Sequence, residues 1–201
     1  FTNISPDHIG PGEHADFEEY LYYKTRLLNM CGIGLVNKDD EHAPQIIKAA
    51  NCELYTYSEE SKEADFVASD IRYVSQPDFV GTEFHISGKY DMEVRLGIPG
   101  LFNVVNALAA VSVCSFLDLD KEKISHALEH IRVNGRMEIV YTSERCTVLV
   151  DYAHNAVSME SLLSTLRDYK PKRLVCVFGC GGNRSKDRRY SMGEIGGKLA
   201  D

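Results

Sequence analysis

Hydrophobic and polar positions along this chain repeat with two different periods. Residues 16–29 carry apolar side chains at helical spacing, and Asp16 and Glu19 have the spacing of a capping box at the start of that helix. The short apolar run CGIGLVN at 31–37 predicts a strand, and EHAPQIIKAA at 41–50 predicts the helix that follows it. A strand followed by a helix indicates an α/β protein.

A segment with a different pattern comes next. The charged run SEESKEAD at 58–65 predicts a solvated loop. In GTEFHISGKYDMEVRLGI, residues 81–98, apolar and polar positions alternate on both sides of 88–91, which predicts a β-hairpin and so a small β-rich insertion. Residues 102–117 are almost all apolar and predict a buried helix, and Asp120 can cap the helix after it.

The last third of the chain alternates strand and helix patterns. CTVLVDYAHN, residues 146–155, predicts a strand that ends in polar residues, and SMESLLSTLRDY predicts an amphipathic helix capped by Ser158. KRLVCVFGCGGN, residues 172–183, predicts a buried strand that runs into glycines, and YSMGEIGGKLA, residues 190–200, predicts another helix. This order is typical of the first half of a doubly wound, Rossmann-like domain.

The change of pattern near residues 137–145 indicates two domains. We expect a first α/β domain over residues 1–140 and the beginning of a Rossmann-like domain over residues 141–201. The chain starts without Met and stops directly after a helical pattern, so we also expect it to be a fragment of a longer protein.

Composition narrows the possible functions. With 44% hydrophobic and 26% charged residues over 201 positions, the chain has the make-up of a globular protein with a core. Its formal net charge of −8 argues against binding nucleic acid through bulk electrostatics. No apolar run is as long as a membrane span, no signal peptide pattern is present, and the six cysteines show no CxxC pair. These features predict a cytoplasmic protein with no membrane insertion.

Lys24 has a charge that does not match its place in the pattern. Phe17, Tyr20 and Leu21 define an apolar helical stripe, and Lys24 falls at the next position of that stripe. A lysine can pack its stem and extend its charge to water, so snorkelling explains the position without any function. The alternative is a functional lysine on the buried side of the helix.

Two later stretches carry candidate binding chemistry. Asp151 and His154 lie at the carboxyl end of a predicted strand, where open α/β sheets bind ligands, although a structural Asp–His pair is an alternative. FGCGGNR at 178–184 places glycines where a backbone can approach an anion, and a tight turn without a ligand is an equal alternative. The basic residues that follow can bind a carboxylate or phosphate, or form a solvated loop: Arg184, Lys186, Arg188 and Arg189.

Six stretches together resemble the Mur ligases, ATP-dependent amide-forming enzymes of peptidoglycan synthesis, and in particular the MurE type that adds the third amino acid. In order, they are FTNISPDHIG, EEYLYYKTRLL, GLFNVVNALAA, NGRME, VDYAHN and VFGCGGNRSKDRR. The resemblance implies most of a central ATPase domain without its upstream P-loop, followed by the start of the C-terminal domain. It also implies that ATP phosphorylates the carboxylate of UDP-MurNAc-L-Ala-D-Glu, after which the amine of a free amino acid attacks the acyl phosphate.

The resemblance implies a magnesium site that uses His8 and Lys24. In the family this lysine is carbamylated, which makes chemical sense because an ammonium cannot ligate a cation. A neutral amine in a desolvated site can instead react with CO₂ and provide a carboxylate-like oxygen. Lys24 is therefore expected to be a catalytic, carbamylated ligand of Mg²⁺ rather than a snorkelling lysine.

The resemblance also assigns residues to ATP and to the amino acid. Asn106 and Arg136 match nucleotide-contacting residues, and Asp151 and His154 match catalytic residues that approach the ATP ribose and phosphates. Arg184 matches an arginine that meets the carboxylate of the incoming amino acid in some members. The motif here is GGNR in place of the commoner GGDR, which leaves the choice of amino acid open.

Two other functions stay open at this point. One is another ligase of the same superfamily, such as a cyanophycin synthetase, and the other is a non-catalytic nucleotide-binding module. A monomer is the simplest expectation, and residues 1–201 alone are expected to be inactive because the P-loop is missing.

Overall fold

Two compact units make up the chain. The computed structural model describes residues 1–5, 9–10, 13–181 and 186–201. Unit 1 consists of three segments, Phe1–Ile71, Phe84–Val94 and Val104–Leu128. Unit 2 consists of Arg72–Glu83, Arg95–Asn103 and Glu129–Asp201.

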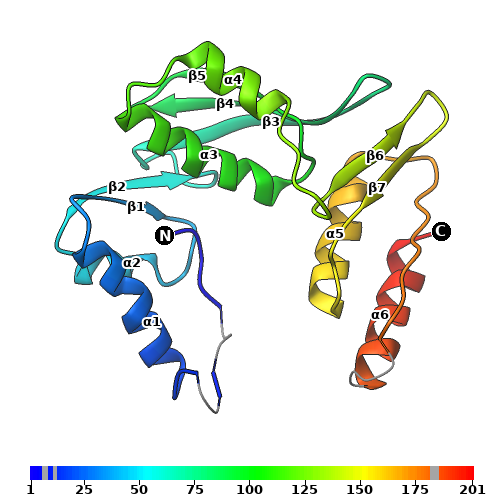
Figure 1. Ribbon diagram of the computed structural model, residues 1–201, viewed down its shortest axis with the longest axis horizontal. Coiled ribbons are helices and arrows are strands. Elements are labelled where there is room, and N and C mark those ends of the chain that lie inside the picture. The colour runs from blue at the N-terminus through cyan, green and yellow to red at the C-terminus, as the bar shows by residue number, and fades with distance from the viewer. Residues whose placement is uncertain (6–8, 11–12, 182–185) are drawn as a thin grey trace. The chain divides into compact units, whose positions relative to one another are not determined.

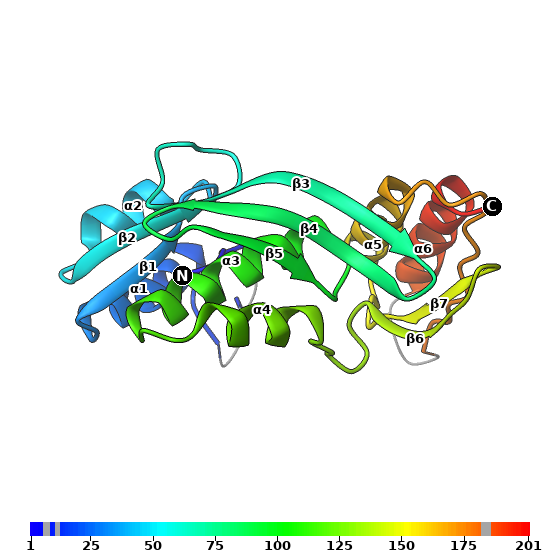
Figure 2. The ribbon, with the colours of Figure 1, turned by 90° about the horizontal axis from the view of Figure 1, so that it is seen from above.

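The larger of the two described sheets has five strands in the order β1-β2-β3-β4-β5. They are β1 (Ile33–Asn37), β2 (Glu53–Ser58), β3 (Phe66–Gln76), β4 (Phe79–Gly88) and β5 (Met92–Leu96). β1 pairs in parallel with β2, and β2 in parallel with β3. β3, β4 and β5 lie side by side (Figure 2). The predicted strand at 31–37 and the predicted hairpin at 81–98 are therefore confirmed, and the hairpin strands belong to this sheet.

Helices cover both faces of the sheet in unit 1. α1 (Phe17–Arg26), the 3₁₀ turn η1 (Leu27–Asn29) and α2 (Ala43–Ala49) pack beside β1 (Figure 1). Leu54 of β2 packs against their core, whereas the ring of Tyr55 contacts that of Phe116 in α3 (Leu101–Phe116) at 4.7 Å between centroids. Because consecutive strand residues face opposite sides, α3 covers the face opposite α1 and α2. The buried residues of the α1–α2 core are Ile4, Leu21, Leu28, Val36, Ala43 and Ile46.

The start of α1 forms the predicted capping box. Asp16 Oδ1 accepts a hydrogen bond from Glu19 N at 2.8 Å. In return, Glu19 Oε2 accepts from Ala15 N at 2.6 Å, one residue before the cap. These bonds satisfy amides that have no partner inside the helix.

The apolar run at 102–117 forms a helix, as predicted, but it is buried on one side only. Val104, Leu108 and Val111 of α3 are buried, whereas Phe102 and Val113 are about half exposed. This pattern fits a helix on the outside of a sheet, which buries one side and presents the other to solvent. Asp120 caps α4 (Lys121–Glu129) as predicted, with its Oδ1 accepting from Lys123 N at 3.1 Å.

β3 is a strand that the sequence patterns did not predict. Its first three residues, Phe66–Ala68, are all buried, so their apolar character does not alternate. This strand lies between β2 and β4, and both faces of its first half are covered. Burial on both faces removes the period of two that identifies a half-exposed strand.

Unit 2 includes an antiparallel hairpin and two helices. β6 (Glu138–Thr142) pairs with β7 (Thr147–Val150), which confirms the predicted strand before the DYAHN stretch. α5 (Ala156–Asp168) and α6 (Lys186–Leu199) pack through a buried cluster of Met159, Leu163 and Met192. The cap of α5 is Asn155 and not Ser158, because Asn155 Oδ1 accepts from Ser158 N at 2.8 Å.

The predicted buried strand at 172–183 is wrong for its described residues, 172–181. These residues form no regular strand, and Val177 is 93% exposed. Leu174 and Cys176 pack against the α5–α6 cluster, whereas the intervening Val175 is exposed. The segment is therefore extended with one apolar side covered, and none of the described strands pairs with it.

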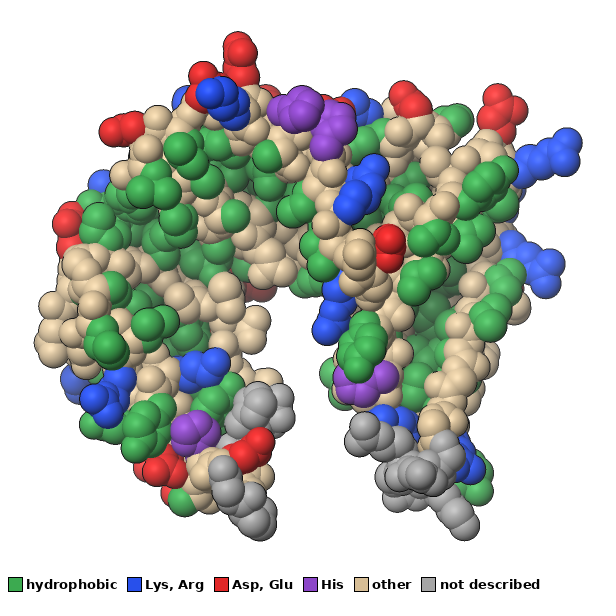
Figure 3. Space-filling model, viewed as in Figure 1, with side chains coloured by type: hydrophobic (Ala, Val, Ile, Leu, Met, Phe, Trp, Pro, Cys, Tyr) green, Lys and Arg blue, Asp and Glu red, His purple; other side chains and the backbone are tan. Residues whose placement is uncertain are grey.

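Hydrophobic side chains reach the surface of unit 2 in several places. Figure 3 shows green side chains at the surface over α5 and α6. The exposed apolar residues of this unit include Val148, Val150, Val157, Val175, Val177 and Phe178. Among the described residues, no helix has the length and apolar character needed to cross a membrane. All six cysteines are free.

Candidate nucleotide site

Asp151 joins two segments of unit 2 that are not adjacent in the sequence. Its Oδ2 accepts a hydrogen bond from Met137 N at 2.9 Å, and its Oδ1 accepts from Ala153 N at 2.7 Å. Met137 is buried and has a left-handed backbone with φ of 45°. The carboxylate therefore ties the NGRM turn to the end of β7 through two charge-assisted bonds.

An aromatic ring lies between two polar side chains at this junction. The guanidinium carbon of Arg136 is 5.0 Å from the centroid of the Tyr152 ring. The same ring is 5.1 Å from the imidazole ring of His154, measured between centroids. The structure thus brings together three of the residues assigned to ATP, namely Arg136, Asp151 and His154, and places Tyr152 among them.

The polar groups of this cluster suit an anion. Among the described residues, no carboxylate forms an ion pair with Arg136, so its guanidinium donors are available to a ligand. His154 Nδ1 is 3.1 Å from the carbonyl oxygen of Tyr152, and since a carbonyl only accepts, Nδ1 carries the proton. Nε2 is then free to interact with a ligand. A planar guanidinium and an imidazole at the end of a strand can bind phosphate oxygens.

Lys24 does not lie on the buried side of α1, and the prediction that it does is wrong. The buried residues of this segment are Leu21, Thr25 and Leu28, whereas Lys24 is exposed. Its Nζ lies over the ring of Tyr20 at 5.2 Å from the centroid. The buried residues start at Leu21 and follow i, i+4 and i+7 spacing, so position 24 lies at the edge of the buried stripe, where the lysine side chain is exposed.

The described residues do not by themselves form a magnesium site. No group of three or more His, Cys, Asp or Glu side chains with metal-ligating geometry occurs among them. Lys24 is an unmodified lysine in this structure, and His8 lies outside the described residues. The unmodified lysine side chain has no oxygen that could coordinate Mg²⁺, so the described residues alone do not make up the site.

The remaining predicted residues belong to unit 1 or lie outside the described residues. Asn106 is exposed on α3 and belongs to unit 1, as does Lys24, whereas the Arg136–His154 cluster belongs to unit 2. Arg184 lies outside the described residues. Of the basic run that follows it, Arg188 is half-buried and Arg189 is exposed on α6.

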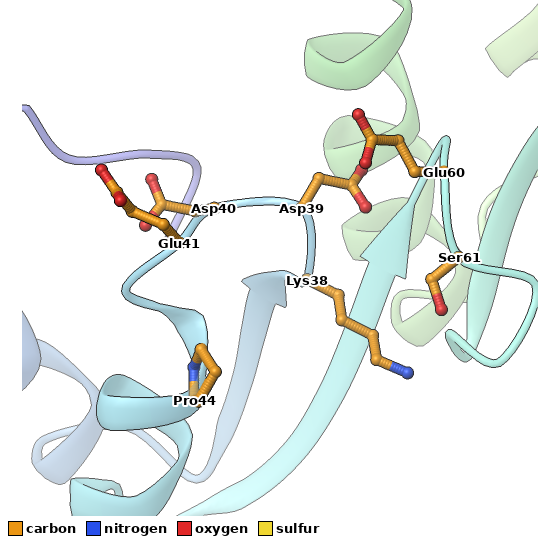
Figure 4. A pocket seen from close by; sticks show the side chains of 7 residues that line it. All are labelled: Lys38, Asp39, Asp40, Glu41, Pro44, Glu60 and Ser61. Carbon is orange, nitrogen blue, oxygen red and sulfur yellow. The ribbon is translucent and has the colours of Figure 1, made fainter.

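Sequence patterns missed a second polar region, at the carboxyl ends of β1 and β2. An open pocket of about 500 Å³ lies there. Figure 4 shows the side chains that line it: Lys38, Asp39, Asp40, Glu41, Pro44, Glu60 and Ser61. Asp39 accepts from the hydroxyl of Ser58 and, at 2.9 Å, from Glu59 N, which joins the ends of both strands. Burial, and the nearby charges of Asp39 and Glu60, raise the pKa of Glu59 above its ordinary value. Four carboxylates repel phosphate, so this pocket does not suit a nucleotide's phosphates.

The run NKDDE after β1 was the signal for this region. A carboxyl end of a parallel strand followed by Asp39 and Asp40 is a typical position for functional or turn-forming side chains. Asp40 is 7% exposed, and its Oδ2 accepts from Ile4 N at 2.9 Å. Its role in the fold is to hold the Ile4 segment against the β1–α2 turn.

Comparison with family models identifies the class of protein. Residues 1–114 match the Mur ligase middle domain, and residues 135–201 match the Mur ligase, glutamate ligase domain. The chain therefore belongs to the Mur ligase family.

Two curated relatives carry the same name. The UDP-N-acetylmuramoyl-L-alanyl-D-glutamate–2,6-diaminopimelate ligase of Alkaliphilus oremlandii is 38% identical over 212 residues, and the ligase of the same name from Clostridioides difficile is 36% identical over 211. Each match covers 100% of this chain and 41% of the relative. The chain thus spans about 41% of the length of these curated relatives.

Solved structures give the same result for the fold. A structure of a UDP-N-acetylmuramoyl-L-alanyl-D-glutamate–2,6-diaminopimelate ligase is 29% identical, with a TM-score of 0.77 over 100% of this chain and 41% of its own. A MurF structure from Acinetobacter baumannii has a TM-score of 0.77 at 23% identity, covering 98% of this chain and 42% of its own. The likeness to MurF concerns the fold alone.

Proposed function

We propose that residues 1–201 are the central and C-terminal parts of an ATP-dependent amide ligase of peptidoglycan biosynthesis. The ligase joins a third amino acid to UDP-MurNAc-L-Ala-D-Glu through an acyl phosphate, acts in the cytoplasm and is a monomer. The single observation that carries the proposal is the cluster of Arg136, Tyr152 and His154 tied together by Asp151, within a segment that matches the glutamate ligase domain. We place the domain boundary at residues 140 and 141.

Phosphoryl transfer of this kind depends mainly on positioning and charge. The negative charge spreads over the oxygens of the transferring phosphoryl group, so cationic donors stabilise it. In this proposal Arg136 donates to phosphate oxygens, and His154 interacts through Nε2. Asp151 keeps unused lone pairs on both carboxylate oxygens, which can accept from the hydroxyl groups of a ribose. Asn106 contacts the adenine.

We propose that Mg²⁺ assists this reaction, with His8 and a carbamylated Lys24 among its ligands. The exposed position of Lys24 leaves its amine accessible to CO₂. The test is Lys24→Ala in the full-length ligase, which is expected to lose activity and to recover part of it with a short added carboxylate. Equal activity of this variant and the wild type would contradict the role of Lys24.

We propose 2,6-diaminopimelate as the amino acid, because the relatives at 36–38% identity are named for it. Arg184 is proposed to bind a carboxylate of that substrate. A panel of diaminopimelate, lysine and ornithine, tested on the full-length ligase, separates these substrates. Faster turnover of lysine than of diaminopimelate would overturn the proposed substrate.

The decisive experiment measures ADP release by the full-length ligase. ADP release that requires both UDP-MurNAc-L-Ala-D-Glu and the amino acid is the expected result. Release with a different acidic substrate instead would indicate another ligase of the superfamily, such as a cyanophycin synthetase. Nucleotide binding without ADP release under any of these conditions would indicate a non-catalytic module. Residues 1–201 alone are expected to be inactive, since no P-loop occurs in their sequence.

A further inference from the structure

Tyr152 is an exposed aromatic residue with ordered polar neighbours. Its side chain is 62% exposed, so the ring contributes little to a core. It nevertheless lies 5.0 Å from the guanidinium carbon of Arg136 and 5.1 Å from the ring of His154. Its contacts are therefore with two of the residues proposed to bind ATP.

The backbone on both sides of Tyr152 is fixed. Asp151 precedes it and bonds Met137 N, while the same carboxylate bonds Ala153 N, the next residue after Tyr152. The carbonyl oxygen of Tyr152 accepts from His154 Nδ1 at 3.1 Å. The ring thus projects from a short segment whose position relative to Arg136 is set by hydrogen bonds.

Arg136 is fixed from the other side. Its own amide donates to Val133 O at 3.0 Å, and the buried side chain of the next residue, Met137, anchors the turn. Gly135 has a φ of 70°, and its amide donates to Glu138 Oε2 at 2.7 Å. The backbone is ordered, but the long side chain of Arg136 would be free to rotate without a neighbour such as the Tyr152 ring.

We propose that Tyr152 is a positioning residue whose ring holds the side chains of Arg136 and His154 in place for the polyphosphate of a nucleoside triphosphate. A guanidinium stacked on an aromatic face keeps its in-plane N–H donors free for phosphate oxygens. Pre-ordering the side chain reduces the entropy that is lost when the ligand binds. This inference rests on the proposed function, and the ring rather than the hydroxyl carries the role.

The test measures the dissociation constant of a non-hydrolysable ATP analogue for the full-length ligase and its variants. Tyr152→Leu removes the aromatic face and is expected to weaken binding roughly fivefold, which is the usual size of an exposed cation–π contact. Tyr152→Phe keeps the ring and is expected to bind within about twofold of the wild type. Tyr141→Leu is the matched control, because Tyr141 is 56% exposed in the same unit and, among the ring contacts of the described residues, none joins it to Arg136 or His154.

A double-mutant cycle with Arg136→Met separates positioning from other roles. If Tyr152 acts through Arg136, Tyr152→Leu is expected to have a smaller effect in the Arg136→Met background than in the wild type. Equal effects in both backgrounds would overturn the positioning role. The melting temperature of Tyr152→Leu is expected to match that of Tyr141→Leu. If the Tyr152 ring had a structural role instead, Tyr152→Leu would melt at a lower temperature than Tyr141→Leu.

The remaining outcomes distinguish this inference from the proposed function. Wild-type binding together with an unaffected Tyr152→Leu variant would overturn only the role of Tyr152. If Tyr152→Phe binds the analogue as weakly as Tyr152→Leu does, the effect belongs to the hydroxyl. That result would also overturn the proposed role of the Tyr152 ring. No analogue binding by the wild type would overturn both the proposed function and this inference.

Discussion

The hydroxyl of Tyr169 donates a hydrogen bond to the carbonyl oxygen of Gly81, with 3.0 Å between the two oxygens. The same hydroxyl oxygen accepts from Gly100 N at 3.2 Å and lies 3.0 Å from Thr82 Oγ1. One side chain at the end of α5 therefore satisfies polar groups from two other segments of unit 2. Burial raises the pKa of this tyrosine above its ordinary value.

Replacing Tyr169 with Phe is expected to lower the free energy of unfolding by about 1–2 kcal/mol, because the Gly81 carbonyl and the Gly100 amide lose a partner. Urea denaturation of the two proteins measures the difference. Tyr190→Phe is the control, since Tyr190 is exposed on α6. Removal of its hydroxyl is expected to change the free energy of unfolding little. Equal losses in both variants would contradict the role of the Tyr169 bonds.

Tyr57 makes stability depend on alkaline pH. Its ring is buried, its hydroxyl donates to Phe1 O at 3.1 Å, and burial followed by the charges of Asp39 and Asp40 raises its pKa. An unfolded tyrosine ionises near pH ~10, so above that pH the folded state holds more protons and stability falls as pH rises.

Tyr57→Phe is therefore expected to lose less stability than the wild type between about pH 9.5 and 11.5, by up to about 1.4 kcal/mol per pH unit. Urea denaturation at several pH values gives the two slopes. Parallel slopes over this range would show that Tyr57 ionises as readily in the folded as in the unfolded chain.

Asp40→Ala is expected to destabilise the fold by about 2 kcal/mol or more, because it leaves two amides without an acceptor. These are Ile4 N and His42 N, each 2.9 Å from a carboxylate oxygen of Asp40. The neighbouring Glu41→Ala is the control, since Glu41 is exposed, and a change within about 0.5 kcal/mol is expected. Thermal or urea denaturation tests the pair, and similar values for both would contradict this role of Asp40.

Gly81 lets two strands approach more closely than a residue with a Cβ at this position would allow. A Cβ at this position would lie 2.1 Å from the carbonyl oxygen of Leu96, which is backbone and cannot move aside without shifting a strand. Gly81→Ala is expected to destabilise the protein by about 2 kcal/mol or more. Gly193→Ala in α6 has open space around its Cβ and is expected to stabilise it by up to about 1 kcal/mol. Melting temperatures that change in the same direction would contradict this contrast.

Asp151→Asn tests the junction beneath the candidate nucleotide site. The neutral amide has one oxygen in place of two, so it cannot accept from both Met137 N and Ala153 N. We expect the affinity of the full-length ligase for an ATP analogue to fall roughly tenfold, the equivalent of about one strong hydrogen bond. Glu144→Gln, an exposed change of the same charge in the β6–β7 turn, is the control. Unchanged affinity in Asp151→Asn would show that the junction does not position the site.

Much of the local structure could be predicted from the sequence because its causes are local. Asp16 caps α1 through an amide three residues away, and the alternation around residues 88–91 is that of a real hairpin. Asp151 and His154 are also close for a local reason, because His154 follows Asp151 by three positions. The family resemblance added Arg136 to this pair, and the structure places it over Tyr152.

The remaining features depend on neighbours that are distant in the sequence. An apolar run at 172–181 matched a buried strand, yet none of the described strands lies beside it to provide hydrogen bonds. Lys24 matched the apolar stripe of α1, but the core packs on Leu21, Thr25 and Leu28 and turns Lys24 to solvent. Tyr152 gave no signal of its own, because its importance depends on a turn sixteen residues earlier.

The sequence by itself determined the helix cap at Asp16, the β1 strand, the hairpin and the family of this protein, since each follows from residue types at short spacing. Only the tertiary structure decided which side of α1 is buried, which apolar segment forms a strand, and that Asp151 joins the NGRM turn to β7. The physical reason is that burial and strand pairing are set by which distant segments meet, whereas caps and turns are satisfied within a few residues.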